Sequence, residues 1–467
     1  MSATAPEILQ LTDELSDLNL GDARLNKRAC QLIETLGSHP DRSIPTACGG
    51  WDEAKAAYRL FDSKKVTAQK LLAPHTHCTV ERMMQHDTVL AIQDTTELDY
   101  TGKDDIEGLG TLNYEQRKGL YLHPTLAITP QRIPLGILDY WSWTRPFEDA
   151  ETESIRWLEG YQRLCEQQQH IWQQAFDTRL VYMADREGDL FDIYAEHRRL
   201  QKQGEQAADF LIRAQHNRIL VSDQHSEESR GQSTEKSKLW PTIEASPKLG
   251  QIEFKMPSAN KRKGRVVQQS LQAARVTIVP PAEHKTEKPV ELTAILAREI
   301  NPPEGEEAIE WMLLTNLEIH TQLQAEEMLS WYLSRWQIEI LFRILKSGCK
   351  IEELQLEKIE RLEPAITLYL LIAWRVLYCT MIGRECPELP CDLIFGDDEW
   401  RAAYILAKSD PPPEQPPTIN EMIRIVAGFG GFLNRKGDGF PGPQTIWIGM
   451  QRTKDFAMMY KAMRKME

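Results

Sequence analysis

Four polar residues in the segment 331–350 have the spacing that places them on one side of an α-helix. The segment reads WYLSRWQIEILFRILKSGCK, and most of its other side chains are apolar. At about 100° per residue, a ~60° arc of this helix holds all four of them: Tyr332, Arg335, Glu339 and Lys346. Burying a carboxylate and two cations for structure alone would be costly unless every charge were paired. We therefore predict a functional polar seam along a single helix.

Two aspartates are predicted to follow directly after buried strands. Asp94 ends the apolar run that starts at Thr88, and Asp185 ends a second short apolar run that leads into a helix. A lone strand-end aspartate is more often a turn former or a helix cap. Two of them at neighbouring strand ends, with Glu339 from a covering helix, would form an oxygen-rich pocket suited to two Mg²⁺ ions. Two ions ~3.5–4 Å apart can stabilise the attacking and leaving oxygens of phosphoryl transfer.

The elements that must position these residues alternate between strands and helices. Residues 19–72 are predicted to be helical, with Asp22 as an N-cap. From His86 onward the pattern predicts a strand, a hairpin over 119–143, a helix, a strand ending at Asp185, a helix and a further strand, which is a mixed α/β arrangement. Residues 216–315 read as a β-rich insertion, before the segment that carries the polar seam.

The charge of the chain limits how it could bind a polyanion. Its formal net charge is −14, which argues against a non-specific grip on nucleic acid by the whole surface. From Ala23 to Lys70, nine Lys and Arg residues stand against five Asp and Glu residues. Composition alone favours a solvated pair of helices there, with a local basic patch as the functional alternative.

Cysteine and hydropathy patterns predict a protein of a reducing compartment. The eight cysteines include no C-x-x-C pair, and the N-terminus is acidic without an apolar core. The most apolar run, at 365–374, is too short to span a bilayer, so no membrane role is expected. The HTHC sequence at 75–78 lacks a second pair of zinc ligands and is read as local surface chemistry.

The polar seam resembles a family signature. Its spacing is similar to the Tyr-Arg-Glu-Lys signature of the IS-four family of bacterial insertion-sequence transposases, and in particular to the cut-and-paste transposase of a kanamycin-resistance transposon. The sequences AIQDTT and MADREGDLFD resemble the two aspartate motifs of that family. LGDARLNKRACQL with AAYRLF is similar to its end-binding domain, EINPPEGEEAIEWMLLTN to the strand that leaves its β-insertion, and GGFLNRKGDGFPGPQTIWIG to its C-terminal pattern.

The resemblance implies a fold and a domain order. The core would be a ribonuclease-H-like mixed sheet interrupted by a β-rich insertion, with helical N- and C-terminal domains. The expected parts are an end-binding domain, the first part of the core, the insertion, the second part of the core with the Glu-bearing helix, and a dimerisation region: 1–72, 73–215, 216–315, 316–385 and 386–467.

The resemblance also implies roles for individual residues. Asp94, Asp185 and Glu339 would be catalytic and would bind two Mg²⁺ ions, for which Mn²⁺ could substitute. The residues expected to contact DNA are Tyr332, Arg335, Lys346, Trp311, Arg213, Arg24, Lys27, Arg28 and Arg59. Trp311 would stack on a flipped base, although a tryptophan of the sheet core is the alternative. Gln215 stands where the family can have a lysine.

The implied function is Mg²⁺-dependent cut-and-paste transposition, with strand nicking, hairpin formation and opening, and strand transfer at the ends of an insertion sequence. The partners would be double-stranded DNA, at transposon ends and target sites, and a second copy of the chain. The expected location is the bacterial cytoplasm, in association with the nucleoid. A DNA-binding protein that occupies transposon ends without cleaving them is the alternative. A paired-carboxylate glycosidase is disfavoured, because its mechanism does not explain why Arg335 and Lys346 share the polar seam.

Overall fold

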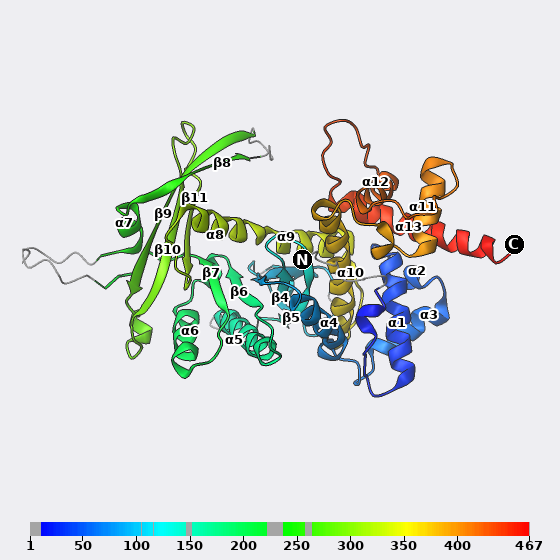
Figure 1. The fold of residues 1–467 in the computed structure, drawn as a ribbon. Helices are drawn as coiled ribbons and strands as arrows, with labels where there is room; N and C mark the ends of the chain where they lie inside the picture. The colour runs from blue at the N-terminus through cyan, green and yellow to red at the C-terminus, as the bar shows by residue number, and fades with distance from the viewer. Residues whose placement is uncertain are drawn as a thin grey trace, which may run out of the picture. The chain divides into compact units, whose positions relative to one another are not determined.

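The computed structural model describes residues 11–103, 105–114, 116–145, 152–221, 237–256 and 264–466. These residues form two compact units, and each unit combines segments that are far apart in the sequence (Figure 1). Unit 1 comprises Met1–His86, Thr95–Ala150 and Trp336–Glu467. Unit 2 comprises Asp87–Asp94 and Glu151–Arg335.

Unit 2 contains a mixed β-sheet. Its strands lie in the order β1 (Thr88–Gln93), β6 (Arg179–Ala184), β7 (Asp209–Arg213), β11 (Glu310–Thr315), β10 (Val290–Glu299), β9 (Arg265–Ile278) and β8 (Lys248–Met256). The first three strands are parallel, and every later pairing is antiparallel. The β-rich character expected for residues 216–315 is therefore present in the antiparallel part of the sheet.

Helices support the strands of this sheet. They are α5 (Thr152–Gln173), α6 (Phe191–Gln203), α7 (Leu239–Glu244) and α8 (Gln322–Ser334), with the 3₁₀ turns η2 (Arg186–Gly188) and η3 (Ala282–His284). Helix α5 packs against β1 and β6. Helix α8 packs against β7, β8 and β9 (Figure 1). Gly160 allows α5 to lie close to the end of β1, because a Cβ at this position would lie 1.8 Å from Nε2 of Gln93.

Unit 1 is mainly helical. Its N-terminal part contains η1 (Asp13–Leu15), α1 (Ala23–Ser38), α2 (Ile44–Cys48), α3 (Trp51–Phe61) and α4 (Ala68–Met83). A small antiparallel group follows, in which β4 (Lys118–Ile128) pairs with β2 (Thr96–Asp99), β3 (Gly110–Thr111) and β5 (Pro134–Trp143). The C-terminal part contains α9 (Trp336–Arg343), η4 (Ile344–Gly348), η5 (Ile351–Glu353), α10 (Ile359–Glu385), η6 (Cys391–Leu393), α11 (Asp397–Lys408), α12 (Ile419–Phe429) and α13 (Pro443–Arg464).

Helix α10 forms the core of unit 1. It is 27 residues long, and among the described residues it is the helix whose length and hydropathy would allow it to cross a membrane. The apolar run that looked too short in the sequence therefore belongs to a longer helix. All of its most apolar 18-residue window is buried within the protein, as expected for a core helix.

A buried polar cluster ties η1 to α4 in unit 1. Nδ1 of His75 lies 2.5 Å from Oε2 of Glu14, and Arg82 donates to both carboxylate oxygens of Glu14 at 2.8 and 3.1 Å. Nε2 of His75 accepts a hydrogen bond from the backbone N–H of Ile137, so the imidazole is neutral and donates from Nδ1. The interpretation of HTHC as surface chemistry is therefore wrong for His75, which is fully buried.

The mixed α/β class and the helical termini are confirmed, but the single helix over 331–350 is not. Helix α8 ends at Ser334, Arg335 forms a turn, and α9 begins at Trp336. The Ser334 hydroxyl donates to the carbonyl of Ser330 at 3.0 Å, a bond that bends helices. A π-helical turn, η4, then carries Lys346. The regular 100° step assumed for the seam is therefore broken twice.

Candidate active site

Asp94, Asp185 and Arg213 stand in one row at the carboxyl ends of three parallel strands. In the β1–β6 pair, Thr88 lies opposite Arg179 and Ile92 opposite Met183. Continuing this register past the strand ends sets Asp94 level with Asp185. The β6–β7 register, with Ala184 opposite Ile212, sets Asp185 level with Arg213. Since neighbouring strands lie about 4.8 Å apart and level residues point to the same face, the row holds two carboxylates and one cation side by side.

Asp94 is in contact with Arg335 of the signature. Nη1 of Arg335 donates to Oδ2 of Asp94 at 2.7 Å, and the two side chains are only 12% and 15% exposed. A short, largely buried, charge-assisted hydrogen bond of this kind is among the stronger polar contacts in proteins. The turn between α8 and α9 therefore presents Arg335 to the strand end that carries Asp94.

Asp185 also caps the turn that follows β6. Its Oδ1 accepts a hydrogen bond from the backbone N–H of Glu187 at 2.9 Å, at the start of η2. The capping role that strand-end aspartates often have is thus present here. One carboxylate oxygen is oriented by the backbone, and the half-buried carboxylate retains further lone pairs for a cation.

Tyr332 joins the row from α8. Its hydroxyl shares a hydrogen bond with Arg213, and it interacts electrostatically with Arg335 and Asp185. Burial raises the pKa of Tyr332, and the two arginines oppose that rise, so the phenol stays protonated at neutral pH. Five of the predicted site residues are therefore neighbours in unit 2, although they come from distant parts of the sequence: Asp94, Asp185, Arg213, Tyr332 and Arg335.

Sequence reasoning missed Asp189, which lies four residues after Asp185 and is completely buried. It accepts hydrogen bonds from the backbone N–H groups of Gln215 and His216 and from the side chains of Arg218 and Tyr194. These bonds fix the chain immediately after the strand that carries Arg213. The only sequence signal was a second acid in the motif DREGD, which carries no information about its partners.

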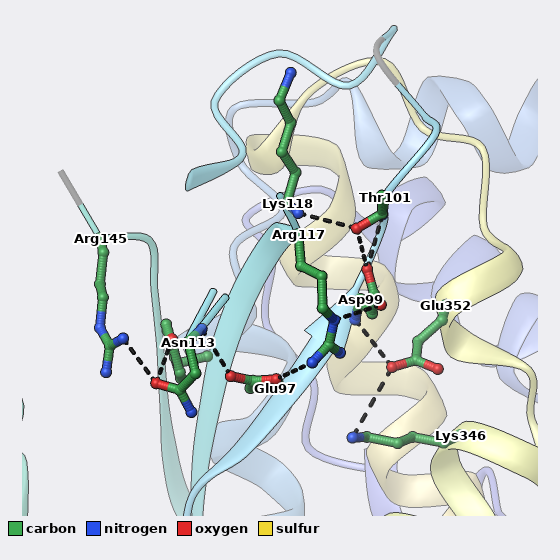
Figure 2. Close-up of polar contacts among 10 residues, drawn as sticks. Glu97, Asp99, Thr101, Asn113, Arg117, Lys118, Arg145, Lys346 and Glu352 are labelled. Atoms are coloured by element: carbon green, nitrogen blue, oxygen red, sulfur yellow. Dashed lines mark hydrogen bonds and ion pairs between the residues drawn. The ribbon is translucent and has the colours of Figure 1, made fainter. Parts of the chain in front are cut away.

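Glu339 and Lys346 belong to unit 1. Glu339 is half-buried in the first turn of α9, where a helix N-terminus favours negative charge. Lys346 lies in the π-helical turn η4, and its Nζ is 3.9 Å from Oε1 of Glu352 (Figure 2). Turns of this type are frequent at functional sites.

Trp311 lies on β11, in the antiparallel part of the unit 2 sheet. It pairs with Ala297 of β10, and its ring lies 6.2 Å from that of Phe254 on β8. The side chain is half-buried rather than enclosed. This placement is compatible with a base-stacking surface and does not make Trp311 a sheet-core residue.

The predicted end-binding residues lie on two packed helices of unit 1. Arg24, Lys27 and Arg28 share one face of α1 by their spacing, and Arg59 is on α3. The Arg24 side chain is 96% exposed, and Asp22 caps α1 as expected. Arg28 lines a hollow between the two helices together with Glu34 and Glu53. The cations are therefore accessible, but acids lie among them.

The donor set fits a divalent metal in part. Asp94 and Asp185 supply carboxylate oxygens, the ligands that Mg²⁺ prefers, from adjacent strand ends. Within the described ranges, no three His, Cys, Asp or Glu side chains are grouped closely enough to hold a metal ion. The third predicted carboxylate, Glu339, lies in unit 1, so unit 2 alone provides two of the three.

Three family models match this chain. The model described as transposase DNA-binding matches residues 10–66, the transposase DDE domain matches residues 190–375, and the transposase Tn5 dimerisation domain matches residues 371–465. The DDE match includes Glu339 and begins just after Asp185. Transposases of this kind use divalent metal ions, and the other two domains indicate DNA binding and homodimer formation.

Along the chain, the three matched domains are a DNA-binding domain, a DDE domain and a dimerisation domain, in that order. A DNA-binding transposase is expected to be soluble and cytoplasmic. The chain is therefore a DNA transposase of the DDE type, an enzyme that cleaves and transfers DNA strands at transposon ends.

Proposed function

We propose that this transposase moves its element by a cut-and-paste route with Asp94, Asp185 and Glu339 as its catalytic carboxylates. The observation that carries the proposal is the level row of Asp94, Asp185 and Arg213 at three parallel strand ends. Two acids beside a cation suit a phosphodiester that binds a metal on one side and a guanidinium on the other. The core is proposed to be ribonuclease-H-like, and the enzyme to belong to the Tyr-Arg-Glu-Lys group of the IS-four family, with the five-part domain order given above.

The three carboxylates are proposed to hold two Mg²⁺ ions, with Mn²⁺ able to replace them. When bound, such ions stabilise the charge that develops on the attacking and leaving oxygens of a phosphodiester. Glu339 follows Arg335 by four residues in the signature, and the resemblance to the family is the ground for grouping it with the two aspartates. Cut-and-paste movement by one pocket would comprise nicking, hairpin formation, hairpin opening and strand transfer.

The cations of the site are proposed to hold DNA phosphates beside the bond that is cut. Arg335, Arg213 and Lys346 would each contact a phosphate, and Tyr332 would donate its hydroxyl, which burial keeps protonated. Trp311 is proposed to stack on a base displaced from the duplex, an interaction worth ~1–3 kcal/mol. Arg24, Lys27, Arg28 and Arg59 would bind the transposon end.

A homodimer on two DNA ends is the proposed synaptic complex, which then captures target DNA. The candidate dimer surface is the C-terminal region. Phe429 packs its ring against Phe456 within unit 1, whereas three methionines of α13 are largely exposed: Met458, Met459 and Met463. We propose these methionines as the apolar contacts between copies. Association with the nucleoid would follow from DNA binding.

The decisive test combines the purified protein, Mg²⁺ and a duplex that carries the terminal repeats of its own element. Cleavage at the ends with a hairpin product supports the cut-and-paste enzyme. A shifted but uncut duplex would instead support the alternative, an end-binding protein without cleavage. A duplex with a scrambled end is the matched control, and omission of the metal should abolish cleavage without abolishing the shift.

Division of labour between two copies can be tested by mixing variants. One variant carries Glu339→Ala, and the other carries Arg24→Ala and Arg28→Ala. Each should be inactive alone, because the first lacks a catalytic acid and the second binds ends weakly. Recovery of cleavage in the mixture is expected if one copy binds an end that its partner cuts. No recovery at any ratio, with both variants folded and associated, would exclude catalysis in trans.

A further inference from the structure

Lys346 is held from two directions in unit 1. Its backbone belongs to the π-helical turn η4, which is closed by a hydrogen bond from the N–H of Cys349 to the carbonyl of Ile344 at 2.8 Å. The same turn is packed at Gly348, where an added Cβ would lie 3.1 Å from the Trp447 ring. Its side chain reaches Oε1 of Glu352, 3.9 Å from Nζ. The π-helical turn thus fixes the Cα of Lys346, and the pair with Glu352 positions its ammonium group.

The position of Glu352 is itself fixed by β2 and the residues after it. The backbone N–H of Asp99 donates to Oε1 of Glu352 at 2.9 Å, the oxygen that faces Lys346 (Figure 2). The Tyr100 hydroxyl donates to the carbonyl of Ile351 at 2.9 Å, and Nζ of Lys103 donates to the carbonyl of Glu352. The first bond therefore holds the Glu352 carboxylate, and the other two hold the backbone that carries it.

Two other carboxylates near Lys346 are engaged elsewhere. Arg117 donates to Oε2 of Glu97 at 2.8 Å and to Oδ2 of Asp99 at 2.9 Å, as Figure 2 shows. The second oxygen of Glu97 accepts from the backbone N–H of Asn113, and that of Asp99 accepts from Thr101. Because Arg117 bridges these two acids, Glu352 is, among the described residues, the carboxylate with which Lys346 pairs most directly.

The Lys346–Glu352 contact is loose, and this matters for binding an anion. Both side chains are 29% exposed, and 3.9 Å is longer than a charge-assisted hydrogen bond. An ammonium has three N–H donors, so one side can face Glu352 while the others stay available. A tight buried pair would have to be broken before a phosphate could bind, whereas this one does not.

We infer that Glu352 is a positioning residue for the transposition reaction: it holds the ammonium of Lys346 in place for a DNA phosphate. The inference rests on the proposed phosphate contact of Lys346. Arg117 supports it indirectly, since it keeps Glu97 and Asp99 from drawing Lys346 away. Burial lowers the pKa of Lys346 and the charge of Glu352 opposes that change, so the same carboxylate also favours the ammonium form.

The test measures binding of a pre-cleaved transposon-end duplex to Glu352→Gln, with Glu353→Gln as the matched control. Glutamine at 352 still accepts the Asp99 N–H but no longer attracts Lys346. Glu353 is the next residue, is 70% exposed, and pairs with Lys350 at 3.7 Å, so its substitution removes the same charge from the same turn. We expect Glu352→Gln to bind about 2- to 5-fold more weakly than Glu353→Gln, the size of a part-exposed ion pair.

Two further measurements distinguish the placement of Lys346 by Glu352 from an effect of net charge and from an effect on folding. In a Lys346→Ala background the difference between the two glutamine variants should vanish, because there is no ammonium left to place. Glu352→Asp keeps the charge but withdraws it by one methylene, so it should also weaken binding, at an unchanged melting temperature. Equal affinities of Glu352→Gln and Glu353→Gln, additive effects with Lys346→Ala, or wild-type binding by Glu352→Asp would each overturn the inference. If Lys346→Ala itself binds like the wild type, the proposed phosphate contact fails instead.

Discussion

Two cations of one sequence signature lie in very different surroundings. Arg335 donates to Asp94 at 2.7 Å with both side chains largely buried, whereas Lys346 lies 3.9 Å from Glu352 with both side chains 29% exposed. The first contact holds Arg335 against the end of β1 in unit 2 and is strong enough to affect folding. The second contributes little to stability, because water screens it. Residues of one motif can therefore differ in how much they contribute to the fold, and we propose that Lys346 serves mainly to bind DNA.

The largest effect is expected from the acids next to Arg335. If Asp185 and Asp94 bind metal as proposed, Asp185→Ala and Asp94→Ala should each lower end cleavage on the order of 10³-fold, because a metal ligand contributes several kcal/mol to the transition state. Binding of uncut ends, measured by gel shift, should change little. The two variants should differ in stability, since Asp94→Ala removes the short hydrogen bond from Arg335. Cleavage retained by either variant would remove that aspartate from the catalytic set.

The buried ion pair of Glu14 and Arg82 is expected to contribute more to stability than either of these two contacts. Burial alone would raise the pKa of Glu14, but hydrogen bonds from His75 and Arg82 outweigh it and lower the pKa from 4.5 to about 2. A depressed carboxyl pKa stabilises the fold above the unfolded value and loses that contribution as pH falls toward the folded value. We expect Glu14 to contribute about 3 kcal/mol near neutral pH, at 1.36 kcal/mol per pKa unit, and to lose it between pH 4.5 and 2.

The measurement is urea unfolding of the wild type and Glu14→Gln as a function of pH. The difference between their free energies of unfolding should shrink across that window, because protonated Glu14 resembles glutamine. A difference that stays constant from pH 6 to pH 2 would show that the carboxylate charge is not what stabilises the cluster.

Arg335→Ala should have an intermediate effect on stability and a clear effect on binding. Loss of a charge-assisted hydrogen bond should lower the free energy of unfolding by about 1.5–3 kcal/mol. Loss of one phosphate contact should reduce the log–log salt slope of DNA binding by about 0.9. Arg335→Lys keeps the charge without the planar guanidinium and is the control. It should retain most of the salt slope of DNA binding but less of the free energy of unfolding.

Arg335 and a metal ion would also compete for Oδ2 of Asp94. Arg335→Ala should therefore bind Mn²⁺ more tightly than the wild type when no DNA is present, as measured by calorimetry. By linkage, DNA that draws Arg335 toward a phosphate should tighten metal binding to the wild type. Equal Mn²⁺ affinity of variant and wild type would show that the ion pair and the metal do not share this oxygen.

The sequence predicts local features of this site better than its contacts. Asp94 and Asp185 do end buried strands, because apolar β-branched runs followed by a polar residue are a local pattern. That Arg213 completes their row depends on the parallel pairing of β6 and β7, which periodicity does not specify. The contact of Arg335 with Asp94 joins residues 241 positions apart, and no local pattern encodes such a distance.

The errors of the sequence-based prediction have both local and tertiary origins. A uniform helical step predicts a continuous seam over 331–350, but a serine back-bond and a π-helical turn change the step. His75 looks like a surface residue until Glu14, 61 positions earlier, is folded against it. No sequence pattern indicates the role of Asp189, although its carboxylate fixes the backbone that follows Arg213. Tertiary partners decided the cases of His75 and Asp189, whereas the seam was changed by local backbone features.

The smallest effect on stability is expected for Lys346→Ala. This variant tests most directly the difference between the contacts of Arg335 and Lys346. Because the pair with Glu352 is part-exposed and long, its loss should change the free energy of unfolding by less than about 0.5 kcal/mol. The salt slope of DNA binding should nevertheless fall by about 0.9, as much as for Arg335→Ala, since one phosphate contact is lost in each case. Lys350→Ala is the control: that lysine lies four residues on, is 43% exposed, and is not predicted to contact DNA. A loss of stability as large as that of Arg335→Ala would place Lys346 among the residues that build the site, and an unchanged slope would remove it from those that grip DNA.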